Sequence, residues 1–231
     1  PSQSIYSSGV RNPHSWNQVD FINAQQYPDV LSAIVRHHNY IAAFGVSSLE
    51  FFYDAANATG SPLSRNESFT VKLGCPAPET IQQTERILIF VSSADSGNYA
   101  VHQVDNFTPK QISDPYVERI LADNIADIPT AKAYYIRCSG HLWYVLRIAN
   151  RTMVYDINEK LWHEWSSNSS SSHVSFNVAY AADTGSGTSM VLGATNGILS
   201  NVSASAYTDN GTSILMDVIT AKQDMVVNLG F

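Results

Sequence analysis

The sequence has few charged residues: Asp, Glu, Lys and Arg together make up 14% of its 231 residues, against roughly 25% in a typical soluble domain. Acidic residues outnumber basic ones, and the formal net charge is -7. No cluster of Lys or Arg could neutralise a row of phosphates. We therefore expect no sequence-specific nucleic-acid binding by this chain.

Cysteine and long apolar runs are also scarce. Cys75 and Cys138 are too few for a disulfide-stapled extracellular fold of this length, and we expect two buried thiols. No apolar run approaches the roughly 20 residues that cross a bilayer, so membrane insertion is not expected. No secretory signal is visible. The chain starts with Pro1 rather than Met, which indicates a processed product or a piece of a longer protein.

Motifs for catalysis and cofactors are largely missing. The sequence has no phosphate-binding loop, dinucleotide fingerprint or Gly-x-Ser-x-Gly elbow. Its histidines lack the i, i+4 spacing and the Cys-x-x-Cys company of a metal site. Asp183-Thr184-Gly185 matches the aspartic-protease signature, but that chemistry needs a second carboxylate and hence a homodimer. We expect no cofactor, no metal and no enzyme, and keep the protease as a remote alternative.

Helical patterns are few and short. Residues 28–37 place apolar side chains on one face but fit a strand equally well. Residues 114–126 follow Ser113, a candidate N-cap, and have Pro115 in the first turn. Strand patterns recur along the whole chain. They cover residues 87–91, 99–104, 133–136, 142–148, 152–155, 175–180, 189–192, 198–202 and 214–219.

Turn residues separate these strand patterns at regular intervals. Asn196-Gly197 and Asn210-Gly211 are the strongest short hairpin signals. Such spacing is typical of a sandwich, a barrel or a propeller. The Ser-rich stretch 166–172 cannot bury apolar area, and we expect a flexible loop there.

One stretch, residues 133–165, has the plan of a complete propeller blade, with four strand patterns joined by short turns. Tyr155-Asp156 ends its third strand, where the carboxylate can cap the following turn. Trp162 comes after that turn, and its indole can fill the wedge between neighbouring sheets. This Tyr-Asp…Trp arrangement resembles the outer hairpin of kelch-type blades, and a hairpin of another β fold is the alternative. We expect an all-β fold of repeated antiparallel meanders with few short helices, a partial or complete β-propeller in one domain spanning residues 1–231.

Three stretches show a more specific resemblance. Residues 40–54 contain a Phe-Gly…Ser-Leu-Glu…Tyr pattern, and residues 140–162 begin with Gly-His-x-x-Tyr and continue through Tyr-Asp to Trp. Residues 207–214 contain an aromatic-x-Asp-x-Gly turn before an Ile. Together these patterns, spread over residues 16–220, resemble the packaged-DNA-stabilisation family of short-tailed bacteriophages, the tail-hub proteins beneath the portal.

The resemblance implies a structural virion protein, located in the tail and assembled in the host cytoplasm. It implies a homo-oligomeric ring that closes the portal channel after packaging, contacts the portal or an adaptor and other tail proteins, and retains the DNA. It brings no catalytic residues. Exposed aromatic side chains would anchor the subunit contacts. The candidates are Trp16, Phe51, Phe52 and Tyr53.

A carbohydrate-binding or glycoside-hydrolysing propeller is the alternative from another class. Trp143, Trp162 and Trp165 could stack on sugars. The carboxylates of Glu50, Asp54, Asp156 and Glu164 could line a cleft. Solvent exposure of the three indoles distinguishes the two hypotheses. Exposed rings beside carboxylates favour sugar, whereas buried rings favour the core of a blade.

Overall fold

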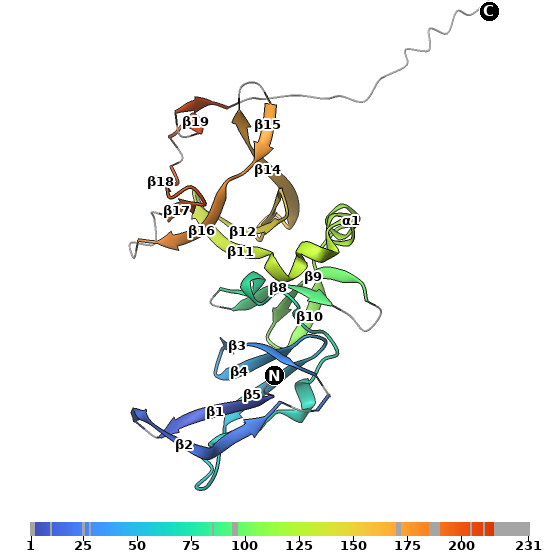
Figure 1. Ribbon diagram of the computed structural model, residues 1–231, viewed down its shortest axis with the longest axis vertical. Coiled ribbons are helices and arrows are strands. Elements are labelled where there is room, and N and C mark those ends of the chain that lie inside the picture. The colour runs from blue at the N-terminus through green and yellow to red at the C-terminus, as the bar shows by residue number, and fades with distance from the viewer. Residues whose placement is uncertain are drawn as a thin grey trace, which may run out of the picture.

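The computed structural model describes residues 3–9, 11–24, 26–27, 29–84, 86–93, 97–169, 172–184, 190–203, 205–209 and 211–214. These residues are mostly β-structure, arranged in consecutive antiparallel sheets. The sheets are stacked along the long axis of the molecule, with the N-terminal ribbon at one end and the last hairpin near the other (Figure 1).

Four of the described sheets are meanders, in which each strand pairs with the next along the chain. Blade 1 comprises β3 (Leu31–His37), β4 (Tyr40–Gly45), β5 (Leu49–Asp54) and β6 (Leu63–Arg65). Blade 2 comprises β7 (Gln82–Gln83), β8 (Ile87–Ser93), β9 (Tyr99–Asp105) and β10 (Thr108–Gln111). Blade 3 comprises β11 (Lys132–Cys138), β12 (His141–Ile148), β13 (Arg151–Asp156), β14 (Leu161–Ser169) and β15 (Ser172–Ser175). Blade 4 comprises β16 (Val178–Asp183), β17 (Met190–Ala194) and β18 (Leu199–Asn201).

The remaining elements flank the blades. A two-stranded ribbon precedes blade 1, and a short hairpin follows blade 4. They are β1 (Ser4–Gly9) with β2 (Asn12–Asn23), and β19 (Thr208–Asp209) with β20 (Thr212–Ser213). The helices are α1 (Pro115–Asp123) between blades 2 and 3, and the short 3-10 turns η1 (Glu67–Phe69), η2 (Pro78–Thr80) and η3 (Ile125–Thr130).

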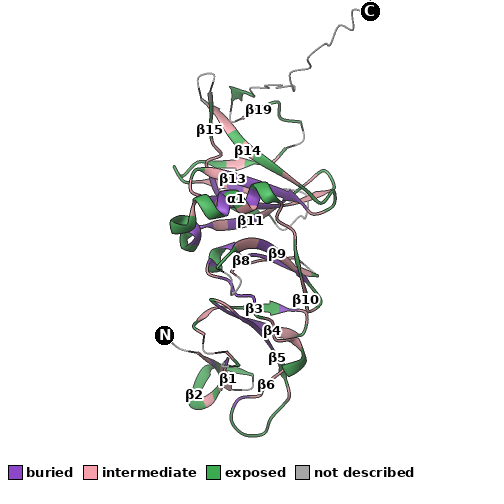
Figure 2. Ribbon diagram, turned by 90° about the vertical axis from the view of Figure 1, so that its right-hand side faces the viewer, coloured by how far each residue is buried: buried purple, intermediate pink, exposed green. Residues whose placement is uncertain are grey.

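The blades pack face to face, and the first strands of blades 2, 3 and 4 lie side by side: β11 contacts both β7 and β16. This is the packing of propeller blades around an axis. Blade 1 lies toward one end of the stack and blade 3 toward the other, with blade 2 between them (Figures 1 and 2). The structure confirms the all-β, propeller-like fold, and the four described blades form an open stack.

Most of the expected elements are present, with shifts at their ends. The stretch 28–37 contains strand β3 rather than a helix. Helix α1 is capped by Asp114, whose carboxylate accepts the Val117 N–H at 2.8 Å, and not by Ser113. The strand expected over 175–180 begins only at Val178. The strand expected over 214–219 lies outside the described residues except for Ile214.

The Ser-rich stretch 166–172 differs from the loop expected there. Ser166–Ser169 continue β14 and pair with Ser172–Ser175 of β15. Strand pairing uses main-chain N–H and C=O groups, which polar side chains do not remove. Residues 170–171 lie outside the described part, and the flexibility of this segment stays a prediction.

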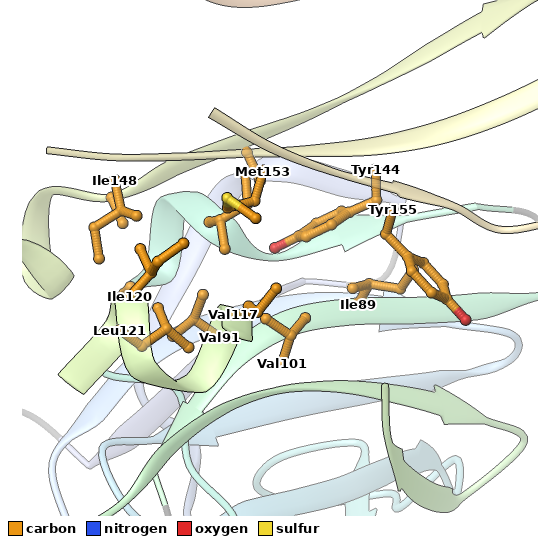
Figure 3. Packing of buried hydrophobic residues seen from close by; sticks show 14 of the residues in the cluster. Ile89, Val91, Val101, Val117, Ile120, Leu121, Tyr144, Ile148, Met153 and Tyr155 are labelled. Carbon is orange, nitrogen blue, oxygen red and sulfur yellow. The ribbon is translucent and has the colours of Figure 1, made fainter. Parts of the chain in front are cut away.

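Burial follows the interfaces between blades rather than one central core (Figure 2). Strand β8 shows the reason, because successive side chains of a strand point to opposite faces. Leu88 and Phe90 pack toward blade 1, whereas Ile89 and Val91 pack toward blade 3 and α1 (Figure 3). The continuous apolar run of β8 therefore belongs to a sheet that is buried on both sides.

Candidate functional site

The turn after β13 is held by one buried carboxylate. Asp156 Oδ1 accepts the main-chain N–H groups of Asn158 at 2.9 Å and Glu159 at 3.1 Å. Its Oδ2 accepts Trp143 Nε1–H at 2.9 Å and contacts His141 Nδ1 at 2.7 Å. Burial works to raise the pKa of Asp156, but these donors outweigh it and lower the pKa. The carboxylate stays ionised, fixes the His141 proton on Nδ1, and ties β12 to the turn.

The two aromatic residues of the same motif lie on the blade 2 side of blade 3. Tyr155 is buried, and the Trp162 ring is half-buried, with the two ring centroids 5.1 Å apart. Trp162 Nε1 donates a hydrogen bond of 2.7 Å to the carbonyl of Ile112, which follows β10. The indole therefore joins blade 3 to the end of blade 2.

Blade 1 has a second Tyr-Asp pair that sequence reasoning did not use. Tyr53-Asp54 ends its third strand, at the same place as Tyr155-Asp156 in blade 3. Asp54 is exposed, and its Oδ1 accepts one N–H among the described residues, that of Ala56 at 2.9 Å. The repeat of Tyr-Asp at the end of a third strand could have predicted this second turn from the sequence.

A second capping carboxylate, Asp29, was also missed. It lies before β3 and accepts hydrogen bonds from the main chain of Ser47 at 2.6 Å and from the Ser48 hydroxyl at 3.1 Å. Burial works to raise the pKa of Asp29, but these donors lower it overall. No pattern in the sequence distinguishes this Asp from other loop carboxylates.

Gly74 lies at a close approach between the β4–β5 connection of blade 1 and strand β8 of blade 2. Its main chain exchanges two hydrogen bonds with Ser93 of β8, of 3.1 and 3.2 Å. A Cβ atom at Gly74 would lie 2.2 Å from main-chain atoms of Val46 and Ser47, which connect β4 to β5. Only glycine fits this position without moving one blade away from the other.

His37 also links these two blades. It ends β3, its side chain is buried, and Nε2 forms a short hydrogen bond with the carbonyl of Asn106 in the turn between β9 and β10. Burial is the largest influence and lowers the pKa of His37 below 6.5. The charge of His38 lowers it further, whereas the Asn106 carbonyl and the charge of Asp105 act in the opposite direction. Burial likewise lowers the pKa of His102, which Glu118 partly offsets.

These two histidines predict a loss of stability on mild acidification. The folded protein holds them neutral, whereas the unfolded chain binds protons as the pH falls through 6.5. The unfolding free energy should therefore decrease from about pH 7.5 to about pH 5, measured by urea titration followed by circular dichroism. The variant His37→Gln should show a flatter pH dependence than the wild type, and His14→Gln, on the exposed ribbon, should not. If the unfolding free energy of the wild type, His37→Gln and His14→Gln fell equally with pH, the loss of stability could not be attributed to His37.

The proposed interface aromatics divide into two pairs. Phe51 and Phe52 are 0% exposed, so the expectation that these two rings are available to a partner subunit was wrong. They occupy opposite faces of β5: Phe51 packs toward blade 2 and Phe52 toward the ribbon. Trp16 is 62% exposed and Tyr53 is 40% exposed. A role for these two in subunit contacts stays a proposal.

Exposed large apolar side chains are frequent in the N-terminal and C-terminal parts of the described chain, and we name two sets of them. The N-terminal apolar surface is formed by the ribbon residues Tyr6, Trp16, Val19 and Phe21. The C-terminal apolar surface is formed by Tyr180, Ile198, Leu199, Tyr207 and Ile214. Other described residues of this kind lie outside these two sets. They are Val30, Ile34, Val46, Tyr53, Tyr116, Ile125, Leu161 and Val174. Exposed apolar patches of this kind mark interaction surfaces.

The outer face of blade 4 shows how one of these surfaces arises. Tyr180, Gly193 and Leu199 are cross-strand neighbours on β16, β17 and β18. Leu192, adjacent to Gly193, points the other way and packs against blade 3. One face of blade 4 is therefore covered by blade 3, while the other presents a tyrosine and a leucine to solvent.

The cysteines do not form a disulfide. Cys75 is buried, and burial raises the pKa of its thiol to about 12. Cys138 is only half-buried, so the expectation of a buried thiol was wrong for this residue. The described residues contain no group of three or more His, Cys, Asp or Glu placed to hold a metal. In that same part of the chain, no helix is long and apolar enough to span a membrane.

The aspartate of the protease alternative lies in blade 4, and the three indoles of the sugar alternative lie in blade 3. Asp183 ends β16 and is exposed, and Gly185 of the same motif lies outside the described residues. Trp143, Trp162 and Trp165 are all half-buried. Trp143 and Trp162 donate their indole N–H groups to the protein, which favours a role in the blade. Trp165 differs, because it also lines a pocket.

A stack of antiparallel meanders of this kind defines a class of fold, the propeller-type proteins. Comparison with protein-family models matches residues 1–200 to the phage-stabilisation family, described as Bacteriophage P22 Gp10, beta-propeller, and the chain belongs to this family of phage structural proteins. A search of curated proteins found no match.

Proposed function

We propose that this protein is a tail-hub subunit that joins the portal to the tail of the virion and retains packaged DNA. The family supports a structural role in a phage particle. The proposal of a tail-hub subunit depends on the two apolar surfaces at opposite ends of the described chain. They suit a subunit with a neighbour on each side. Its role is passive: buried contacts between rigid blades hold a channel closed.

A homo-oligomeric ring follows from the same surfaces. When two different surfaces of one chain meet in head-to-tail contacts, the contacts form a ring if the rotation between subunits closes. The N-terminal apolar surface of one subunit would meet the C-terminal apolar surface of the next. A net charge of -7 favours passage of DNA through the channel over adhesion to its wall, because like charges repel.

The ring predicts which substitutions weaken assembly. Trp16→Ser and Leu199→Ser each remove an exposed apolar side chain from one end, and each should weaken self-association by about 10- to 100-fold, as for loss of a buried aromatic or leucine contact. Leu161→Ser is the matched control, because Leu161 is 56% exposed but lies outside both surfaces. Mass photometry over a concentration series measures the effect, and equal weakening by all three would argue against this ring.

Retention of DNA is tested on phage heads filled with DNA but prepared without this protein. Addition of the wild-type chain should make the packaged DNA resistant to nuclease, and Leu161→Ser should do so equally well. Trp16→Ser and Leu199→Ser should protect less at the same concentration, because retention requires assembly. Heads that lose their DNA at the same rate with and without the wild-type chain would disprove the function.

A further inference from the structure

A pocket of about 490 Å3 lies beside the outer hairpin of blade 3. Its walls come from β14 and β15, from blade 4, and from Ile136, Phe176, Val202, Ser203, Ala206, Thr208, Asp209 and Ile214. Its volume lies within the roughly 300–1,000 Å3 of small-molecule sites. The proposed hub function needs no ligand there.

The inner part of the pocket is aromatic and apolar. The rings of Trp165 and Phe176 both line it, and they pack edge to face with centroids 5.6 Å apart. Leu192, which belongs to the interface between blades 3 and 4, lines it as well. Trp165 is further held by the Trp143 ring, with centroids 5.4 Å apart. The Trp165 ring is therefore held between two other aromatic rings.

The rest of the lining is polar and mostly uncharged. It includes Asn168, Ser203, Thr208 and Asp209, and no Lys or Arg of the described chain lines the pocket. Glu164 also lines it, but its carboxylate is paired with Arg151 at 2.6 Å. His173 also lines it, but without a permanent cation, and with the carboxylates of Glu164 and Asp209 in the lining, the pocket does not suit a phosphate or another anion.

Asn168 provides a separate indication of a ligand. Its Nδ2 donates a hydrogen bond of 3.1 Å to the carbonyl of Ser213, which fixes the orientation of the amide. Its Oδ1 is buried and has no hydrogen-bond partner among the described residues. A buried acceptor without a donor is unfavourable, and a hydroxyl group in the pocket would supply the missing donor.

We infer that this pocket binds a neutral sugar. A sugar presents C–H groups to aromatic rings and hydroxyls that both donate and accept hydrogen bonds, which matches an aromatic wall beside amide and hydroxyl groups. An apolar anchor from a protein partner would match the aromatic wall but leave the polar groups without partners. Trp165 and Phe176 supply the stacking surface, and Asn168, Ser203 and Asp209 supply the polar contacts.

The test uses glucose, galactose, mannose and N-acetylglucosamine as neutral probes, and glucose 6-phosphate as a charged one. Saturation-transfer NMR and tryptophan fluorescence should show saturable binding of at least one neutral sugar, with a dissociation constant on the order of 1 mM, and weaker binding of the phosphate ester. Absence of binding by all four neutral sugars at roughly 10 mM, or tighter binding of the phosphate ester, would overturn the inference.

Variants locate the binding. Asn168→Ala and Ser203→Ala should each weaken it by about tenfold, as for loss of one hydrogen bond in a binding site. Trp165→Phe keeps an aromatic ring but reduces its area, and should weaken binding and remove most of the fluorescence change. Trp16→Phe, on the distant ribbon, should change neither the affinity nor the fluorescence response. Sugar binding that is unchanged in Asn168→Ala, Ser203→Ala and Trp165→Phe would mean that the sugar binds outside this pocket, and would contradict the inference. The hub function is tested separately, by self-association.

Discussion

Gly74→Ala is expected to lower the unfolding free energy by more than about 4 kcal/mol, enough to prevent stable folding of blades 1 and 2. The added Cβ atom would lie 2.2 Å from main-chain atoms of Val46 and Ser47. Main-chain atoms cannot swing aside as the end of a flexible side chain can. The segment carrying Gly74 must therefore move away, which breaks its two hydrogen bonds with Ser93 and opens the packed interface between the blades.

Gly193→Ala is the matched control for this substitution. Gly193 lies in β17, where the nearest atom to an added Cβ is 3.8 Å away, an ordinary contact distance. The substitution should change stability by less than about 1 kcal/mol, and a strand position can even favour alanine over glycine. Urea unfolding followed by circular dichroism compares both variants with the wild type. Similar losses for Gly74→Ala and Gly193→Ala would show that the close approach of the two blades is not the cause.

Asp156→Ala should lower the unfolding free energy by about 2–4 kcal/mol. The carboxylate serves four donors: two main-chain N–H groups of the turn, the Trp143 indole and His141 Nδ1. Because Asp156 is buried, water cannot easily replace it, and the donors that it leaves stay partly unsatisfied. Loosening of the turn should also release Trp143, which near-ultraviolet circular dichroism can detect.

Asp54→Ala is the matched control, because Asp54 ends the third strand of blade 1 but makes one capping bond and is exposed. Asp54→Ala should lower the unfolding free energy by about 0.5–1 kcal/mol. The pH dependence gives a second control. The pKa of Asp156 is lowered in the fold, so its contribution is present above the unfolded value near 3.8 and is lost as the pH falls through the lower folded value. The difference between wild type and Asp156→Ala should therefore narrow below about pH 3.8. A difference that is the same at pH 7 and near pH 2 would refute the ionised cap.

Much of the fold could be predicted because its determinants are local. Alternation of apolar residues, turn residues between short strands and the Tyr155-Asp156…Trp162 pattern all lie within a few tens of residues, and the strands of blade 3 pair in sequence order. The same local signals misplaced the N-cap of α1 by one residue, because Ser113 and Asp114 are both good capping residues. They also suggested a loop where Ser166–Ser169 continue a strand, because composition does not reveal main-chain pairing.

The candidate sites were less predictable, since they depend on which blade faces which. Phe51 and Phe52 are as apolar as the ring of Trp16, yet only Trp16 is exposed, because the faces of β5 are covered by blade 2 and by the ribbon. The pocket beside Trp165 draws on three parts of the chain that have no shared sequence signature.

By itself, the sequence determined the class of fold, the order of strands within the blades and the chemistry of the turns, because these depend on interactions between neighbours along the chain. The tertiary structure alone decided the close approach at Gly74, the bond from His37 to Asn106 and the covering of each sheet face. His37 and Asn106 are 69 residues apart. Contacts over such separations form only once the sheets have stacked, so no single segment of the sequence predicts them.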